Sequence, residues 1–198
     1  MPLPPSTVSR SLLHTRTYRA QAFEREDGLL DIEAEIMDVK DYDFPSQMSE
    51  SGVHNAGDPV HHMLMRVTID KHYVIQDVVA TYGAAPYRQH CTGIADAYRQ
   101  LIGLSLVKGF KRAVREIMSR TAGCTHMTEL TDILPTVAIQ SMVKEARSAK
   151  QVAEESNASQ QRPFQIDGCH ALRSSGEVVR MFYPKWYEAA EHTEVVPE

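Results

Sequence analysis

LLDIEAEIMDVK, residues 29–40, is the stretch that decides the fold class. Its apolar residues at positions 30, 32, 34 and 36 alternate with acidic residues at 31, 33 and 35, and this period of two is typical of a strand with one buried face. The preceding stretch, HTRTYRAQAFERE at residues 14–26, also favours a strand, and Asp27-Gly28 after it is a turn signal. We therefore predict a β-hairpin over residues 14–40.

A second hairpin and a set of helices are predicted further along the chain. HMLMRVTID, residues 62–70, alternates again and is joined by a short connection to YVIQDVVATY, residues 73–82. From Cys91 onward the apolar residues recur at spacings of three and four, which predicts helices with a break near Gly103. A later helix over residues 126–156 is expected to kink at Pro135. Strands followed by helices indicate an α+β fold, a mostly antiparallel sheet with helices packed on one face.

Three regions are expected along the chain. Residues 1–11, with prolines at positions 2, 4 and 5, are expected to form a flexible arm. Residues 12–156 are expected to form the main α+β domain, which is long enough to bury a core without disulfides. Residues 157–198 begin with a polar linker and are expected to continue as a short β-hairpin and an aromatic anchor, packed on the same domain.

The composition is that of a soluble globular protein and excludes two classes of function. The 198 residues are 42% hydrophobic and 24% charged, with a formal net charge of −5, whereas nucleic-acid-binding domains usually carry a basic field. No apolar run reaches the roughly 18 residues that span a membrane, and the first ten residues lack the apolar segment of a secretory signal. We therefore expect a cytoplasmic protein with no nucleic acid or membrane partner and three reduced cysteines.

TAGCTHMTEL, residues 121–130, holds the densest chemistry, with a thiol, an imidazole and a carboxylate at an expected helix start. Free backbone N–H groups at a helix N-terminus stabilise a thiolate, which is both a nucleophile and a metal ligand. Thr125 is the expected N-cap of this helix. Cys124 and His126, together with Cys91 at another helix start and His61 after a Gly/Pro loop, predict a zinc or iron site. The alternative is that the cysteines are small buried hydrophobes and His61 is a solvated loop residue.

A second candidate site lies in the first hairpin. His14 and Arg16 share one face of their strand, and Asp31 and Glu33 share one face of the next. If the two strands pair so that these faces meet, the side chains form an acid–base patch, in which His14 and Glu33 transfer protons and Arg16 holds a substrate carboxylate. The alternative is a solvated sheet face with cross-strand ion pairs.

The motifs together resemble a family of domains of unknown function that is common in proteobacteria, for which no activity is settled. The resemblance rests on HTR at 14–16, RxDGLxDIE at 25–33, DxK at 38–40, GxPxHxM at 57–63, Cys91, LxGL at 101–104 and GCTHxxEL at 123–130. In the middle of the chain, a weaker resemblance is to iron–sulfur assembly scaffolds and related cysteine-bearing domains. That resemblance implies a metal site at Cys91, Cys124 and His126, with His61 or His126 in place of the scaffold's third cysteine.

Three functions, and one alternative without catalytic activity, follow from these candidates. The first is an enzyme, a lyase or hydrolase acting on a small organic acid or aromatic compound, with a bound zinc or iron and with His126 as ligand or catalytic group. The second is a metal or iron–sulfur handling module that works with a partner protein. The third is a metal-free acid/base lyase. The alternative to all three is a structural protein with inert thiols. Methionines and tail aromatics could also form the apolar face of a homodimer.

Overall fold

The computed structural model describes residues 2–47, 49–142, 162–163 and 165–189. The chain divides into two compact units, residues 1–143 and residues 144–198. Each unit is described by itself.

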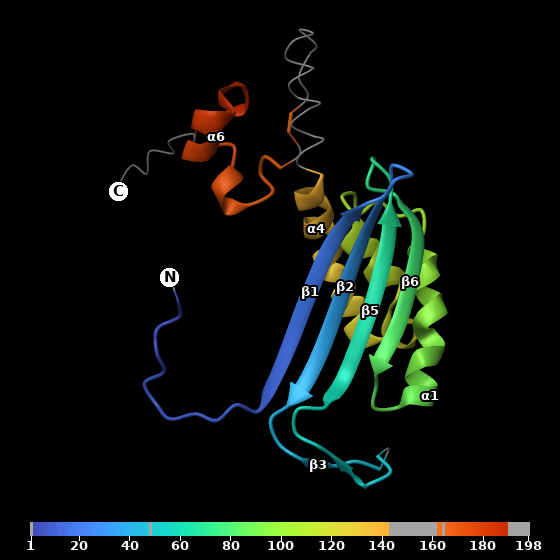
Figure 1. Ribbon diagram of the computed structural model, residues 1–198. Coiled ribbons are helices and arrows are strands. Elements are labelled where there is room, and N and C mark those ends of the chain that lie inside the picture. Colours follow the sequence, from blue (N-terminus) through green and yellow to red (C-terminus); the bar gives the residue numbers. More distant parts are fainter. Residues whose placement is uncertain (1, 48, 143–161, 164, 190–198) are drawn as a thin grey trace, which may run out of the picture. The chain divides into compact units, whose positions relative to one another are not determined.

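The first unit is built on a four-stranded antiparallel sheet (Figure 1). Its strand order is β1-β2-β5-β6, so that each hairpin contributes one edge strand and one central strand. A small two-stranded ribbon, β3 with β4, lies in the connection between the two hairpins. The strands are β1 His14–Glu24, β2 Leu30–Lys40, β3 Phe44–Pro45, β4 Val53–His54, β5 Pro59–Ile69 and β6 Ile75–Ala84.

The turn of the first hairpin sets the register of β1 against β2. The Arg25 N–H donates to the Leu29 carbonyl at 3.0 Å, and the Gly28 N–H donates to the Arg25 carbonyl at 3.1 Å. Gly28 has φ +82°, a conformation that a residue without Cβ adopts at little cost. The loop therefore has three residues, and the register places Arg16 opposite Asp38.

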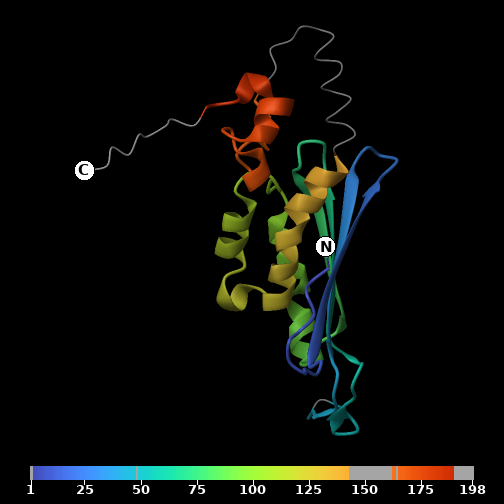
Figure 2. The same cartoon turned by 90° about the vertical axis from the view of Figure 1, so that its left-hand side faces the viewer.

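The helices of this unit lie on one side of the sheet, and the other side is not covered by them (Figure 2). Gly103, with φ +88°, and Gly109, with φ +66°, lie in the break between the helical segments Thr92–Leu101 and Phe110–Ile117, as predicted for Gly103. A 3-10 turn precedes the helix Leu134–Ser141, which has Pro135 in its first turn, so the expected interruption there is present. The helical segments are α1 Arg88–Cys91, η1 Thr92–Leu101, α2 Phe110–Ile117, η2 Arg120–Ala122, α3 Thr125–Leu130, η3 Thr131–Ile133 and α4 Leu134–Ser141.

One hydrophobic core fills the space between sheet and helices. Every second residue of β2 is buried in it, from Ile32 to Ile36, because side chains alternate between the two faces of a strand. The prediction of an α+β fold with a mostly antiparallel sheet and helices on one face is confirmed. The largest side chains at its centre are Ile32, Ile36, Met63, Met65, Ile69, Tyr98, Leu101, Met127, Leu130 and Leu134.

The second unit is helical where the structure describes it, so the predicted short β-hairpin is wrong. Its elements are η4 His170–Leu172, α6 Glu177–Phe182 and η5 Pro184–Trp186. The Asp167 carboxylate accepts hydrogen bonds from the Ser174 N–H and from Arg162, and these contacts close a compact turn that leaves no extended segment. Gly176 is the N-cap of α6.

Two parts of the expected organisation lie outside these observations. The later part of the helix expected to reach residue 156, and most of the linker, fall outside the described residues. The packing of residues 157–198 on the main domain stays a prediction. Among the described residues, no helix is both long and apolar enough to cross a membrane.

Candidate functional site

A buried carboxylate, Asp38, is the centre of the candidate site. It continues the buried face of β2 by one more step of two residues after Ile36, so that it points toward the helices. Only 3% of Asp38 is exposed, and a carboxylate of this burial requires strong hydrogen bonds to remain charged. Its surroundings supply them from three directions.

Arg16, opposite Asp38 in the hairpin, binds both of its oxygens. The Arg16 Nε donates to Asp38 Oδ1 at 2.7 Å and Nη2 donates to Oδ2 at 2.8 Å, the two-pronged geometry that suits a guanidinium. His14, two residues earlier on the same face, places Nε2 2.9 Å from Oδ1. Burial alone would raise the pKa of Asp38, but the hydrogen bonds from Arg16 and His14 outweigh it and hold that pKa well below its usual range. Asp38 is therefore an anion.

The third nitrogen of Arg16 reaches across to the helices. Its Nη1 donates to Glu129 Oε2 on α3 at 2.7 Å, and the Tyr18 hydroxyl donates to the other Glu129 oxygen. Arg16 thus binds two carboxylates of its own chain, and its hydrogen bonds to Asp38 raise its pKa. The role expected for it, holding a substrate carboxylate, would require one of these bonds to be exchanged.

Two further histidines face the free side of Asp38 Oδ2. His61 Nδ1, on β5, lies 3.1 Å from this oxygen, and His126 Nε2, on α3, lies 3.6 Å from it. The two imidazole rings stack with their centroids 3.9 Å apart. Burial lowers the pKa of both histidines from the usual 6.5, which favours the neutral form that a metal ion requires.

These three groups could hold a metal ion. In the part of the chain that the structure describes, Asp38, His61 and His126 form the group whose ligand atoms all lie within 4.8 Å of one another. Two atoms bound to one zinc at about 2.0–2.1 Å, at a tetrahedral angle, lie about 3.3 Å apart. The observed separations of 3.1 and 3.6 Å bracket this value. Two imidazoles and one carboxylate are a donor set used by catalytic zinc and by non-haem iron.

The structure brings together four of the residues nominated from the sequence and leaves Glu33 apart. His14, Arg16, His61 and His126 all surround Asp38. Glu33 lies on the opposite face of β2, opposite Gln21 and Arg66. The expected pairing of Glu33 with His14 and Arg16 is wrong because a hairpin closed at Asp27-Gly28 aligns the start of β1 with the end of β2.

The two cysteines nominated as ligands lie outside this group. Cys124 is itself the N-cap of α3, in place of Thr125, and packs against the core. Its backbone N–H donates to the Tyr98 hydroxyl and its carbonyl accepts from the same hydroxyl, both at 2.9 Å. Cys91 ends α1 and is half-buried. Metal binding by either cysteine stays a prediction.

The sequence analysis did not connect Asp38, Glu129 and Tyr18 with Arg16. A signal for Asp38 was present, because it extends the even-numbered apolar face of residues 30–36 with a charge. Glu129 was noted as the carboxylate of residues 121–130, but nothing in the sequence linked it to Arg16, which lies 113 residues away in the chain. Only the docking of α3 on the sheet brings these two together.

Fold and site together define a class of protein: an α+β domain whose sheet presents a buried carboxylate, ringed by three histidines and an arginine, to its covering helices. The chain belongs to the family described as Protein of unknown function (DUF2889), whose model matches residues 14–140. That match begins at His14 and extends into α4, so it contains every residue of the cluster. No curated protein and no solved structure matches the chain.

Proposed function

We propose that the protein is a metal-dependent enzyme, with zinc or iron bound by Asp38, His61 and His126, and that it is a lyase or hydrolase. The observation that supports it is the convergence of these three ligand groups from β2, β5 and α3 on one point. The proposed substrate is a small organic acid or aromatic compound, and the proposed location is the cytoplasm.

The local charge balance favours a cation. Asp38 and Glu129 contribute two negative charges and Arg16 one positive charge, which leaves a net charge of −1 when the imidazoles are neutral. A divalent cation bound there would convert this small negative excess into a positive centre, which attracts an anionic substrate. Arg16 and Glu129 would hold Asp38 in place, because hydrogen bonds to a ligating carboxylate orient it.

A bound zinc or iron would supply a Lewis acid that polarises a substrate oxygen or lowers the pKa of water. His14 is suited to move the proton. Because Asp38 is ionised and can only accept, the His14 Nε2 carries the hydrogen of their bond. In a neutral ring the other nitrogen, Nδ1, carries no hydrogen and can accept one, and the His14 side chain is 37% exposed, so a substrate can reach it.

A second candidate is the metal-free acid/base lyase. The observation that favours it is that the Arg16 guanidinium already donates hydrogen bonds to both oxygens of Asp38. Asp38 would then orient the His14 ring and stabilise its protonated form, as a buried aspartate does for the histidine of hydrolytic triads. The third function, a metal or iron–sulfur handling module with a partner protein, depends on Cys91 and Cys124, which lie outside this cluster.

Metal content decides between the first two candidates. The full chain is purified without a metal-affinity tag, incubated with Zn²⁺ or anaerobically with Fe²⁺, desalted, and measured by mass spectrometry. The variants are His61→Gln and His126→Gln, and the matched control is His62→Gln. His62 is the next residue of β5, but it points to the other face, where its Nε2 lies 2.6 Å from Glu35 Oε1.

We expect about one ion per chain in the wild type and in His62→Gln, and a loss of at least tenfold in metal affinity in His61→Gln and His126→Gln. A wild type that binds neither ion would contradict the metal proposal and leave the acid/base candidate. Equal loss in all three histidine variants would show that the effect is not specific to this cluster.

A further inference from the structure

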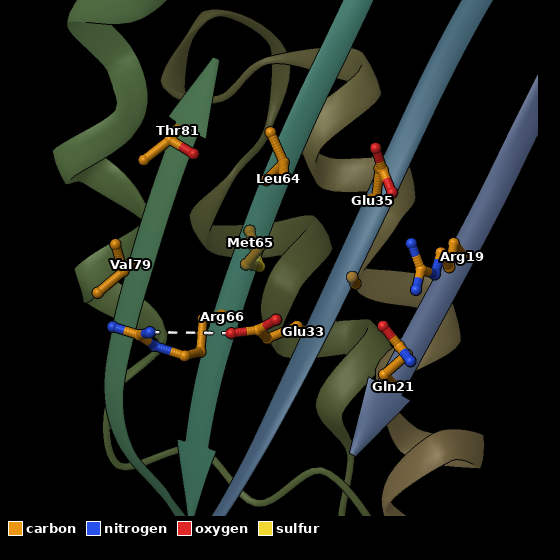
Figure 3. Close-up of a pocket in the computed structure, with 10 residues that line it drawn as sticks. Arg19, Gln21, Glu33, Glu35, Leu64, Met65, Arg66, Val79 and Thr81 are labelled. Atoms are coloured by element: carbon orange, nitrogen blue, oxygen red, sulfur yellow. Dashed lines mark ion pairs between the residues drawn. The ribbon is translucent and has the colours of Figure 1, made fainter. Parts of the chain in front are cut away.

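The sheet face that the helices of the first unit do not cover carries an ordered pattern of charge. Side chains of the four strands form a shallow hollow there, seen face-on in Figure 3. Leu64 and Val79 are apolar residues in it, each more than a third exposed. Arg66 Nη1 lies 3.8 Å from Glu33 Oε1, and both side chains are about half exposed. This distance is beyond hydrogen-bond range, so both charges can still take a closer partner.

The strand register arranges these side chains in two rows across the sheet. One row runs from β1 to β6 through Arg19, Glu35, Leu64 and Thr81. The next row runs through Gln21, Glu33, Arg66 and Val79. Both rows are visible in Figure 3. The central strands therefore differ in charge, since β2 presents two glutamates and β5 presents an arginine beside a leucine.

We propose that this face is a homodimer interface, in which two copies pack sheet to sheet around a two-fold axis parallel to the strands and midway between β2 and β5. Such an axis lays β2 of each copy over β5 of the other at the same height along the strands. Glu33 of each copy then faces Arg66 of the other, twice per dimer. Leu64 and Val79 enter the interior of the interface.

The charge pattern disfavours three other two-fold arrangements of the same face. An axis along β2 would place Glu33 over Glu33 of the other copy, and an axis along β5 would place Arg66 over Arg66 of the other copy. An in-plane axis perpendicular to the strands would put the glutamates of the two β2 strands over one another. Like charges placed across an interface cost several kcal/mol, so among these four arrangements the axis between β2 and β5 is the one that pairs opposite charges.

The available area is sufficient for a small dimer interface. Four strands of 10 to 11 residues, about 4.8 Å apart and rising about 3.3 Å per residue, give a footprint of roughly 600 Å² per copy. Two such faces bury roughly 1,200 Å², the lower end of the range for specific interfaces. We therefore expect a dimer that dissociates on dilution.

Charge reversal tests the arrangement. The mass of the full chain is measured by light scattering during size exclusion, loaded at about 100 µM because interfaces of modest area can be as weak as micromolar. The variants are Glu33→Arg and Arg66→Glu, alone, combined in one chain, and mixed as two separate single variants. The control is Arg112→Glu, because Arg112 on α2 is 85% exposed and faces away from the core. Circular dichroism checks that each variant is folded.

We expect a dimer for the wild type, the control and the double variant, and monomers for each single variant alone. The mixture of the two single variants is decisive, because each chain keeps two like charges side by side and only a contact between chains can pair opposite charges. An equimolar mixture should therefore form a dimer. A monomeric wild type, two persistent monomers in the mixture, or dimers in both single variants would each overturn the proposal, whatever the metal content.

Discussion

At the scale of single residues, Arg16 connects the parts of the candidate site. Its guanidinium binds Asp38 on β2 and Glu129 on α3 at once. Because the fork of donors is rigid, it fixes the carboxylate of Asp38 relative to the helix that carries His126. The site is therefore organised before any ligand is bound.

Two tyrosines near α3 allow a matched test of this local order. The Tyr98 hydroxyl, in a side chain that is fully buried, accepts from the Cys124 N–H and hydrogen-bonds the Cys124 carbonyl and Thr128. The Tyr82 hydroxyl is also buried, beside the Cys124 thiol, but no described residue offers it a hydrogen bond of ordinary geometry. Burial raises the pKa of both tyrosines, so both are neutral at pH 7.

We expect Tyr98→Phe to lower the free energy of unfolding by about 1–3 kcal/mol, because it leaves the buried N–H of Cys124 without a partner. Tyr82→Phe should change it by less than about 0.5 kcal/mol, because no well-formed hydrogen bond is lost. Urea denaturation at pH 7 measures both values. Equal losses in the two variants would contradict this account.

At the scale of elements, the three-residue loop of the first hairpin decides which side chains meet. It aligns His14 and Arg16 with the far end of β2, where Asp38 lies. A loop with one residue more or fewer would shift the pairing, and Arg16 would face a neighbour of Asp38 that points to the other side of the sheet. The turn therefore determines which side chains meet in the site, although it lies at the opposite end of the hairpin.

Gly28 in this loop gives the prediction at the element scale. Gly28→Ala forces a residue with Cβ to φ +82°, which should cost about 1–2 kcal/mol of unfolding free energy. Gly93→Ala is the control, because Gly93 lies in η1 without a positive φ and a Cβ there would meet no atom within 4 Å. That control should be neutral or slightly stabilising, by up to about 1 kcal/mol.

Urea denaturation of both glycine variants gives the comparison. A stable Gly28→Ala protein would mean that the loop relaxes to another turn. In that case the distance between Arg16 and Asp38 would change as well, and metal affinity would report it.

At the scale of the whole molecule, the candidate site and the described hydrophobic core both belong to the first unit. Among the described residues, the buried members of the core cluster lie between Ile32 and Met142. The candidate site lies between His14 and Glu129, and the family match ends at residue 140. The second unit has buried residues of its own, Ile166 and Val179.

We therefore expect a chain ended after residue 143 to fold by itself. It should unfold cooperatively within about 5 °C of the full chain, because it keeps every residue of the described core cluster, and it should bind metal with the same stoichiometry. Thermal unfolding followed by circular dichroism, together with metal content, tests this. A truncated chain that lacks cooperative unfolding would show that residues 144–198 complete the core.

Local patterns in the sequence determined the type and order of the main elements. Alternation predicted the strands within residues 29–40 and 62–82, and the spacing after Cys91 predicted helices, because burial of one face imposes these periods. The strand within residues 14–26 was predicted from its residue types and from the turn signal at Asp27-Gly28. His14, Arg16, His61 and His126 were also chosen from local sequence alone. The same local reasoning failed at residues 167–187, where side-chain contacts of Asp167 favour turns over strands.

The tertiary structure alone decided which of those residues share a site. Glu33 was wrongly grouped with Arg16 because hairpin register depends on the loop. Cys124 and His126 were grouped because they are close in sequence, but the structure places His126 beside Asp38 and leaves Cys124 outside that cluster. Glu129 joins Arg16 through packing across 113 residues. Sequence periods report which face of an element is buried, whereas the meeting of two buried faces depends on packing between elements that are distant in the chain.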